Sequence, residues 1–141
     1  MPETQNNKIT VIIPTLNEAD NIGKLIQYLK QCGQEHLAEI IVCDAGSEDA
    51  TVSIVKENEA QIIQCKQASR AHQMNEGAKM ATGDILYFVH ADAKPPKSFA
   101  TDLVRYINKG LDFGCYRFKF DSKHPFLAVN SFLYPFQGAL V

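Results

Sequence analysis

The sequence lacks the features that mark membrane, secreted and nucleic-acid-binding proteins. No apolar stretch approaches the roughly 20 residues that a membrane-spanning helix needs. The first seven residues are polar and do not resemble a signal peptide, so we expect a cytoplasmic protein. With 14 basic and 16 acidic residues, the formal net charge is −2, which argues against broad binding to nucleic acids or acidic membranes.

Two spacing patterns are missing as well. The four cysteines, Cys32, Cys43, Cys65 and Cys115, show no Cys-x-x-Cys spacing, so we expect small core residues rather than disulfides or zinc ligands. Residues 14–20 contain no Gly-x-Gly-x-x-Gly turn and no Gly-Lys-Ser/Thr loop, which excludes the common dinucleotide and P-loop sites. The same lack of glycines disfavours a sugar-nucleotide pyrophosphorylase.

What the chain does contain is an alternation of strand and helix signals over 141 residues, a length suited to one domain. Strands separated by helices imply right-handed crossovers, so we expect a three-layer, Rossmann-like α/β fold with a mostly parallel sheet. The expected strands are residues 9–13, 39–43, 61–65, 83–89 and 111–120, and the expected helices are residues 22–33, a short helix after 49, 69–81 and 95–109.

Local signals also predict where some of these elements begin and end. Pro14 is expected to end the first strand, because it has no N–H to give to a neighbouring strand. Asp20 is available as the N-cap of the first helix, and Pro95 is expected to start the last one. The apolar side expected for the helix at 69–81 consists of Ala71, Met74, Ala78 and Ala81.

The apolar run before residue 90 ends abruptly in His90 and Asp92. Open α/β sheets bind their ligands at the carboxyl ends of their strands. Because alternate residues of an extended chain project to one side, His90 and Asp92 would face the same cation. The alternative is that Asp92 caps the next helix and that His90 is a buried, hydrogen-bonded histidine.

Polar loops follow the first two strands. Asn17 and Glu18 offer an amide and a carboxylate suited to a nucleobase edge or a ribose, with helix capping as the alternative for Asn17. Asp44 ends the second strand, where its carboxylate can accept a hydrogen bond from an imide N–H such as that of uracil. Gly46 permits a tight turn of positive φ. Turn and capping roles are favoured for the other polar residues of this loop, Ser47, Asp49 and Thr51.

These loops are expected to meet at one edge of the sheet. If the first and fourth strands are neighbours, with the second and third beyond the first, the chain reverses direction between the first and the fourth. Such a switch point is where sheets of this kind form their ligand crevice. The convergence of three polar loops there predicts a binding site.

In combination, four segments resemble family 2 glycosyltransferases of the GT-A fold. They are residues 11–18, 41–51, 69–78 and 83–92. The similarity is strongest to a soluble bacterial branch in which the fourth strand ends in His-Ala-Asp. The resemblance extends from residue 8 to about residue 120, and it implies that the chain binds a nucleoside-diphosphate sugar.

The resemblance assigns roles to individual residues. Thr15 and Glu18 would lie against the nucleoside, with Asn17 holding their loop, and Asp44 would contact the base beside Ser47. The full set implied at the donor nucleotide is Pro14, Thr15, Asn17, Glu18, Asp44, Gly46, Ser47, Arg70, Asn75 and Ala91.

The same resemblance implies a divalent cation, Mn²⁺ or Mg²⁺. Asp92 would be the metal-linked carboxylate, and Arg70 would approach the ribose or diphosphate along a wall shaped by Asn75. The commoner family motif is Asp-x-Asp, but here its first position is His90. Imidazole binds Mn²⁺, whereas Mg²⁺ strongly prefers oxygen, so Asp92 is the firmer ligand. His90 either joins it or hydrogen-bonds the phosphate or the ribose.

The implied activity is inverting transfer of a hexosyl group from a UDP- or GDP-sugar to an unknown acceptor. The family's general base comes from beyond the donor half, yet Asp121 is the only acidic residue after Phe120. We therefore expect a donor-binding domain at 1–121 and an apolar tail at 122–141. The tail would be a truncated acceptor region or a surface for homo-oligomerisation. The alternative function is a non-catalytic nucleotide-sugar-binding or interaction module.

Overall fold

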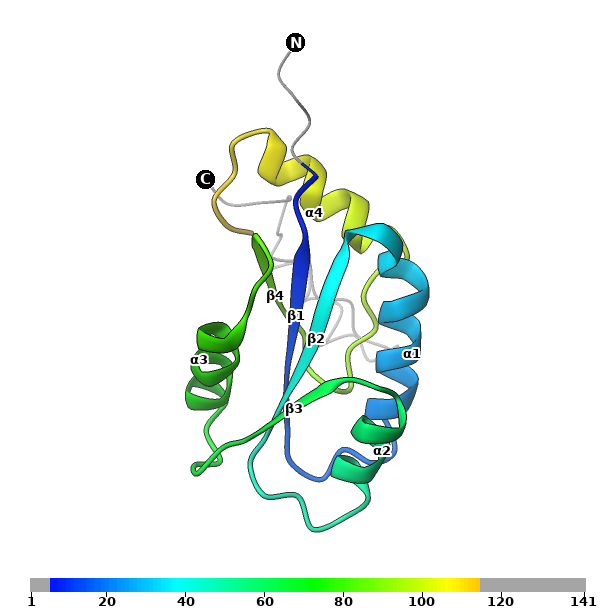
Figure 1. The fold of residues 1–141 in the computed structure, drawn as a ribbon, viewed down its shortest axis with the longest axis vertical. Helices are drawn as coiled ribbons and strands as arrows, with labels where there is room; N and C mark the ends of the chain where they lie inside the picture. The colour runs from blue at the N-terminus through cyan, green and yellow to red at the C-terminus, as the bar shows by residue number, and fades with distance from the viewer. Residues whose placement is uncertain (1–5, 115–141) are drawn as a thin grey trace, which may run out of the picture. The chain divides into compact units, whose positions relative to one another are not determined.

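The computed structural model describes residues 6–114, and these contain a parallel four-stranded sheet in the order β3-β2-β1-β4 (Figure 1). The expected α/β architecture is thereby confirmed. Its elements are β1 (Ile9–Thr15), α1 (Ile22–Gly33), the 3-10 helix η1 (Gln34–His36), β2 (Leu37–Asp44), α2 (Thr51–Glu57), β3 (Gln61–Gln64), α3 (Arg70–Met80), β4 (Ile85–Phe88) and α4 (Phe99–Asn108).

The chain divides into two compact units, Met1–Val104 and Arg105–Val141, and the whole described sheet belongs to the first. Residues 111–114 do not form the start of the expected last strand. The remainder of that strand, Cys115 and the apolar tail at 122–141 lie outside the described residues.

The central strand, β1, is buried at all seven of its residues. The prediction that Pro14 ends it is wrong, because β1 continues to Thr15. The carbonyl of Ile12 accepts a hydrogen bond from the N–H of Val89, which follows β4. The backbone nitrogen of Pro14, two residues later, therefore points to the same edge of β1, toward β4. On that side β4 has already ended at Phe88. The missing N–H of Pro14 therefore deprives no neighbouring strand of a hydrogen bond.

Helices α1 and α2 pack together on one face of the sheet, and α3 covers the other (Figure 1). At Gly77 of α3, a Cβ atom would lie 2.6 Å from Cγ2 of Ile12 and 2.8 Å from Sγ of Cys43, so any larger residue would force these side chains to move. The apolar side expected for this helix is partly wrong: Ala71 is exposed, and the buried residues are Gln73 and Gly77. The expected residues that do pack against the sheet are Ala78 and Ala81.

The helix starts also differ in part from expectation. The residue before α1 is Asn21, which makes no side-chain capping bond, so Asp20 is not the N-cap. Helix α4 begins at Phe99, later than the expected start at Pro95, and the N–H of Phe99 donates to the carbonyl of Pro96 (3.0 Å). None of the helices within residues 6–114 is long and apolar enough to cross a bilayer.

Glu39 joins β2 to the turn that precedes β4. Its Oε1 accepts hydrogen bonds from the hydroxyl of Thr10 (2.9 Å) and from the N–H (2.6 Å) and hydroxyl (2.8 Å) of Thr82. Its Oε2 accepts from the amide of Gln61 (2.8 Å). Desolvation by itself would raise the pKa of Glu39, but the hydrogen bonds from Thr82, Thr10 and Gln61 together hold that pKa below its ordinary value.

A pH dependence of stability follows from Glu39. Because its pKa is lowered in the folded state, the stability it contributes is present above its unfolded-state pKa of about 4.3 and is lost as the pH falls through the lower folded-state value. We expect Glu39→Gln to cost about 1–2 kcal/mol at pH 7 and to flatten the fall in stability below about pH 4.5. Urea denaturation between pH 7 and pH 3 measures this, with the exposed Glu57→Gln as control. An unchanged pH profile in Glu39→Gln would contradict the assignment.

Candidate functional site

The loops that follow β1 and β2 are locked together at the carboxyl edge of the sheet. The N–H of Asn17 donates to Oγ of Ser47 (2.8 Å), and the N–H of Glu48 donates to Oδ1 of Asn17 (2.8 Å). Asn17 has a φ of 54°, a left-handed conformation that asparagine tolerates better than most residues. Through this reciprocal pair, Asn17 ties the loop after β1 to the loop after β2.

The next two residues of the first loop are bound in the same way. The N–H of Glu18 donates to Oγ1 of Thr51 (2.8 Å), and that of Ala19 donates to Oδ2 of Asp49 (3.1 Å). The other oxygen of Asp49 accepts from the N–H of Thr51 (2.9 Å) and from its hydroxyl. Hydrogen bonds from the Thr51 hydroxyl and then from backbone N–H groups lower the pKa of Asp49. Asp49 has the predicted turn role, but the residue before α2 is Ala50, which makes no side-chain capping bond, so neither Ser47 nor Asp49 is the N-cap of that helix.

Asp44 is the buried centre of this arrangement, with 0% of its surface exposed. Its Oδ1 accepts hydrogen bonds from the hydroxyls of Thr15 (2.8 Å) and Ser47, and its Oδ2 accepts from the N–H groups of Gly46 (3.1 Å) and Ser47 (2.8 Å). Four donors fill the capacity of one carboxylate. Gly46 has a φ of 89°, which confirms the predicted positive-φ turn. In this arrangement no oxygen of Asp44 is open to a nucleobase, and the direct base contact stays a prediction.

A residue that the sequence did not single out, Gln73, supports the loops from the α3 side of the sheet. Only 4% of Gln73 is exposed, and its Nε2 donates to the carbonyls of Thr15 (2.9 Å) and Cys43 (2.8 Å). One side chain therefore ties the ends of β1 and β2 to α3. The available signal was spacing, since Gln73, Gly77 and Ala81 recur every four residues on the face that meets the sheet.

The segment after β4 forms a tight turn. The N–H of Ala93 donates to the carbonyl of His90 (2.9 Å), so Asp92 lies in a turn and the expectation of an extended chain through residues 90–92 is wrong. The side chains of His90 and Asp92 are both exposed, so His90 is not the buried histidine of the alternative interpretation. Helix α4 starts seven residues beyond Asp92, which also removes the capping alternative.

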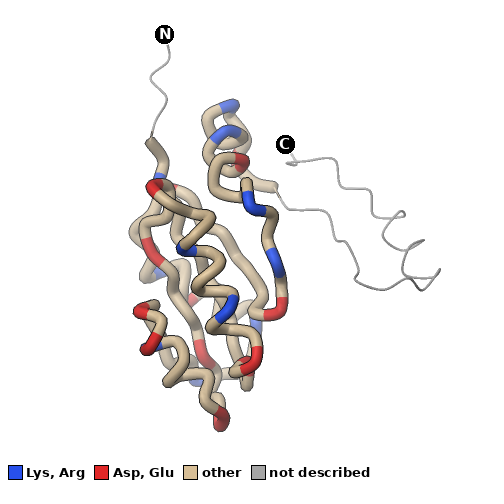
Figure 2. Tube along the Cα trace, turned by 90° about the vertical axis from the view of Figure 1, so that its right-hand side faces the viewer, with Lys and Arg blue, Asp and Glu red and all other residues tan. Residues whose placement is uncertain are grey.

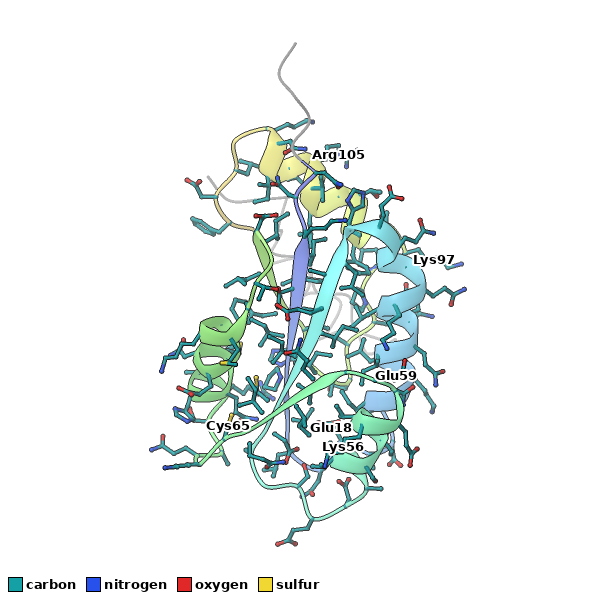
Figure 3. The ribbon with its side chains drawn as sticks, in the orientation of Figure 1. Glu18, Lys56, Glu59, Cys65, Lys97 and Arg105 are labelled. Atoms are coloured by element: carbon teal, nitrogen blue, oxygen red, sulfur yellow. The ribbon has the colours of Figure 1, made fainter. Side chains whose placement is uncertain are left out.

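A cleft of about 320 Å³ lies between α1 and this turn, with Asp92 on its border. The cleft adjoins the first loop, because Nδ2 of Asn21, one of its lining residues, donates to Oε2 of Glu18 (3.1 Å). Figure 3 shows Glu18 at the end of the sheet where β1 finishes. The full lining is Asn21, Lys24, Leu25, Tyr28, Ala91, Asp92, Ala93 and Lys94.

The remaining predicted residues are divided between buried and exposed positions. Pro14 and Thr15 are buried in β1. Arg70, the first residue of α3, and Asn75 are exposed, and neither lines the cleft. Within residues 6–114, no group of three or more histidine, cysteine, aspartate and glutamate side chains is close enough to hold a metal ion.

The chain is similar to known proteins both in sequence and in fold. The profile of glycosyl transferase family 2 matches residues 10–136. A dolichol-phosphate mannosyltransferase of Pyrococcus furiosus is 30% identical over 110 residues, which cover 74% of this chain and 31% of that protein. A glucosyl-3-phosphoglycerate synthase of Petrotoga mobilis is 46% identical over 66 residues, 45% of this chain and 20% of that protein. The chain thus spans a third or less of these two relatives.

Solved structures agree on the fold. The glucosyl-3-phosphoglycerate synthase of Mycobacterium tuberculosis in complex with UDP has a TM-score of 0.67 at 24% identity, covering 80% of this chain and 46% of that one. The same enzyme in complex with Mn²⁺, UDP and glucosyl-3-phosphoglycerate has a TM-score of 0.63 at 24% identity, covering 72% and 39%. These neighbours have the GT-A fold, which confirms the predicted fold class.

Proposed function

The chain belongs to glycosyl transferase family 2, and we propose that it binds the donor of a glycosyl transfer, a UDP- or GDP-sugar, at the carboxyl edge of its sheet. The observation that carries the proposal is the pair of interlocked loops after β1 and β2, together with the exposed Asp92 after β4. β1 pairs with both β2 and β4, so this edge is the switch point at which open α/β sheets bind ligands.

In this proposal the first loop contacts the nucleoside. Leu16 is 46% exposed and offers an apolar surface to the base. Glu18 uses Oε2 for Asn21, which leaves Oε1 for a ribose hydroxyl. Asp44 fixes the position of this loop through its hydrogen bonds with Thr15 and Ser47. In the proposal, Arg70 approaches the ribose or the diphosphate.

The residues after β4 fit a divalent cation that arrives with the diphosphate. Asp92 is exposed and supplies a carboxylate, a ligand that suits Mn²⁺, and His90, exposed at the start of the same turn, is the candidate for a second ligand. Substrate phosphate oxygens and water commonly complete the shell of such a cation, so a third protein ligand is not required. When bound, the cation would offset the negative charge of the departing nucleoside diphosphate.

The proposed reaction is displacement at the anomeric carbon of the donor sugar. An acceptor oxygen forms a bond to that carbon as the bond to the diphosphate breaks, with inversion, and the acceptor proton passes to a base. The loops after β1 and β2 hold the nucleotide so that the reacting carbon is fixed, which is the contribution that positioning makes to a reaction of two substrates. The base is not assigned among the described residues.

Nucleotide binding tests the proposal. We expect calorimetry to detect UDP or GDP binding that is stronger with Mn²⁺, and we expect Asp92→Ala to weaken binding in Mn²⁺ about 10- to 100-fold, with little change in its absence. Glu57→Ala, which removes an exposed carboxylate at the end of α2, should bind like the parent. If neither nucleotide bound to a folded sample, the proposed function would be excluded.

A further inference from the structure

The cleft beside Asp92 is bounded by two elements that one tyrosine holds together. The hydroxyl of Tyr28, on α1, donates to the carbonyl of Pro95 (2.6 Å), which anchors the segment after β4 against the helix. The Nζ of Lys94 lies 5.7 Å from the centre of the Tyr28 ring, within the range of a cation–π contact. The ammonium group of Lys94 therefore lies over the Tyr28 ring at the border of the cleft, although the residue is exposed.

The charges that line the cleft are unbalanced. Lys24 and Lys94 contribute two ammonium groups, while Asp92 contributes the one carboxylate. Neither lysine has a carboxylate within 4.0 Å among the residues that the structure describes. Figure 2 shows basic positions both on α1, which faces the viewer, and on the segment that precedes α4. An anion placed between these two elements would be attracted by both ammonium groups.

Size and chemistry favour a phosphoryl group as that anion. A volume of about 320 Å³ lies at the lower end of the range for small-molecule sites, so a phosphate with a small substituent fits. Lysine binds phosphate as a point charge, without the planar geometry that arginine requires. One N–H of the Asn21 amide and the hydroxyl hydrogen of Tyr28 are already donated to Glu18 and Pro95, so the charged lysines are the lining groups most able to bind an anion.

We propose that the cleft between α1 and residues 91–94 binds a phosphoryl group of the substrate through Lys24 and Lys94. The inference rests on the proposed function, since a phosphoryl group at this place lies beside the residue that would hold the cation. The phosphoryl group belongs either to the donor diphosphate or to a phosphorylated acceptor. The two sources share one chemistry, and separate probes distinguish them.

The probes are UDP against uridine and glycerol 3-phosphate against glycerol, measured by calorimetry on the full chain at low and at physiological salt. We expect Lys24→Gln and Lys94→Gln each to lower the affinity for a phosphorylated probe about five- to tenfold. The double variant should lower that affinity further. Lys97→Gln is the matched control, because Lys97 is also an exposed lysine, three residues after Lys94, and does not line the cleft. Figure 3 shows Lys97 well separated from Glu18.

Each outcome decides the proposal. A lysine-dependent loss for UDP assigns the site to the donor diphosphate, and one for glycerol 3-phosphate assigns it to a phosphorylated acceptor. If the double variant bound both phosphorylated probes like the parent, or if neither probe bound better than uridine and glycerol, the proposal would be overturned. Lysine-dependent binding of glycerol 3-phosphate, with no binding of UDP or of GDP, would sustain this site and exclude the proposed function, so the two failures are distinguishable.

Discussion

Replacing Asp44 with alanine is expected to lower the free energy of unfolding by about 3 kcal/mol and to abolish measurable nucleotide binding. The change removes the acceptor of four hydrogen bonds at a position with no exposed surface. The hydroxyl of Thr15 and the N–H and hydroxyl of Ser47 would then lose their partner, and a buried unsatisfied group costs about 1–3 kcal/mol. The two loops that form the proposed site would separate.

Asp44→Asn should also be damaging, although it keeps the size of the side chain. The amide nitrogen of asparagine is a donor, so it would face the N–H groups of Gly46 and Ser47, which donate to a carboxylate oxygen in the parent. Urea denaturation and calorimetry with UDP and GDP measure the two effects. The matched control is Glu48→Ala, which removes an exposed carboxylate from the same loop and leaves the Glu48 N–H bonded to Asn17. A stable Asp44→Ala protein that merely changed its preference between UDP and GDP would instead show that Asp44 reads the base.

The second large effect is expected at Gln73. Gln73→Glu preserves the shape of the side chain but replaces the donating amide with a carboxylate oxygen facing the carbonyls of Thr15 and Cys43. We expect a loss of about 2–3 kcal/mol in stability at neutral pH, because both carbonyls lose the hydrogen bond from Gln73 and a buried negative charge is left facing two carbonyl oxygens. Nucleotide affinity should fall by at least about tenfold, since the ends of β1 and β2 carry the proposed donor loops.

A control separates loss of stability from loss of positioning. Gly77→Ala lies one turn further along α3 and is also destabilising, by about 1–3 kcal/mol, because the added Cβ would meet Ile12 and Cys43. It leaves the hydrogen bonds of Gln73 in place. At temperatures where both variants are folded, Gly77→Ala should retain nucleotide affinity and Gln73→Glu should not. Equal nucleotide affinity in the two variants would show that Gln73 contributes to stability only and does not position the donor loops.

The order of the strands and helices was predictable because its signals are local. Apolar, β-branched runs and the spacing of Ile22, Leu25, Ile26 and Leu29 predict elements that the structure confirms. The errors occur where a neighbour in space decides. Pro14 stays within β1 because β4 has already ended beside it, and nothing in residues 9–15 records where β4 ends.

The candidate site, too, was predictable in some respects and not in others. Side-chain type and position at a strand end sufficed to select Asp44, Asn17 and Asp92 as residues of the carboxyl edge. Their exposure was not predictable, because it depends on partners in other loops. Asp44 is buried among the groups that donate four hydrogen bonds to it, whereas the turn closed by the N–H of Ala93 leaves Asp92 exposed to solvent.

By itself, the sequence determined the family, the alternation of elements and the sheet edge that carries the polar loops. These follow from patterns within about ten residues, the range over which periodicity and turn chemistry act. Only the tertiary structure decided that Asp44 is buried, that Gln73 ties β1 and β2 to α3, and that Lys24 and Lys94 line one cleft. The bonds from Gln73 span 58 and 30 residues of chain, and no local pattern specifies which backbone carbonyls such a side chain will meet.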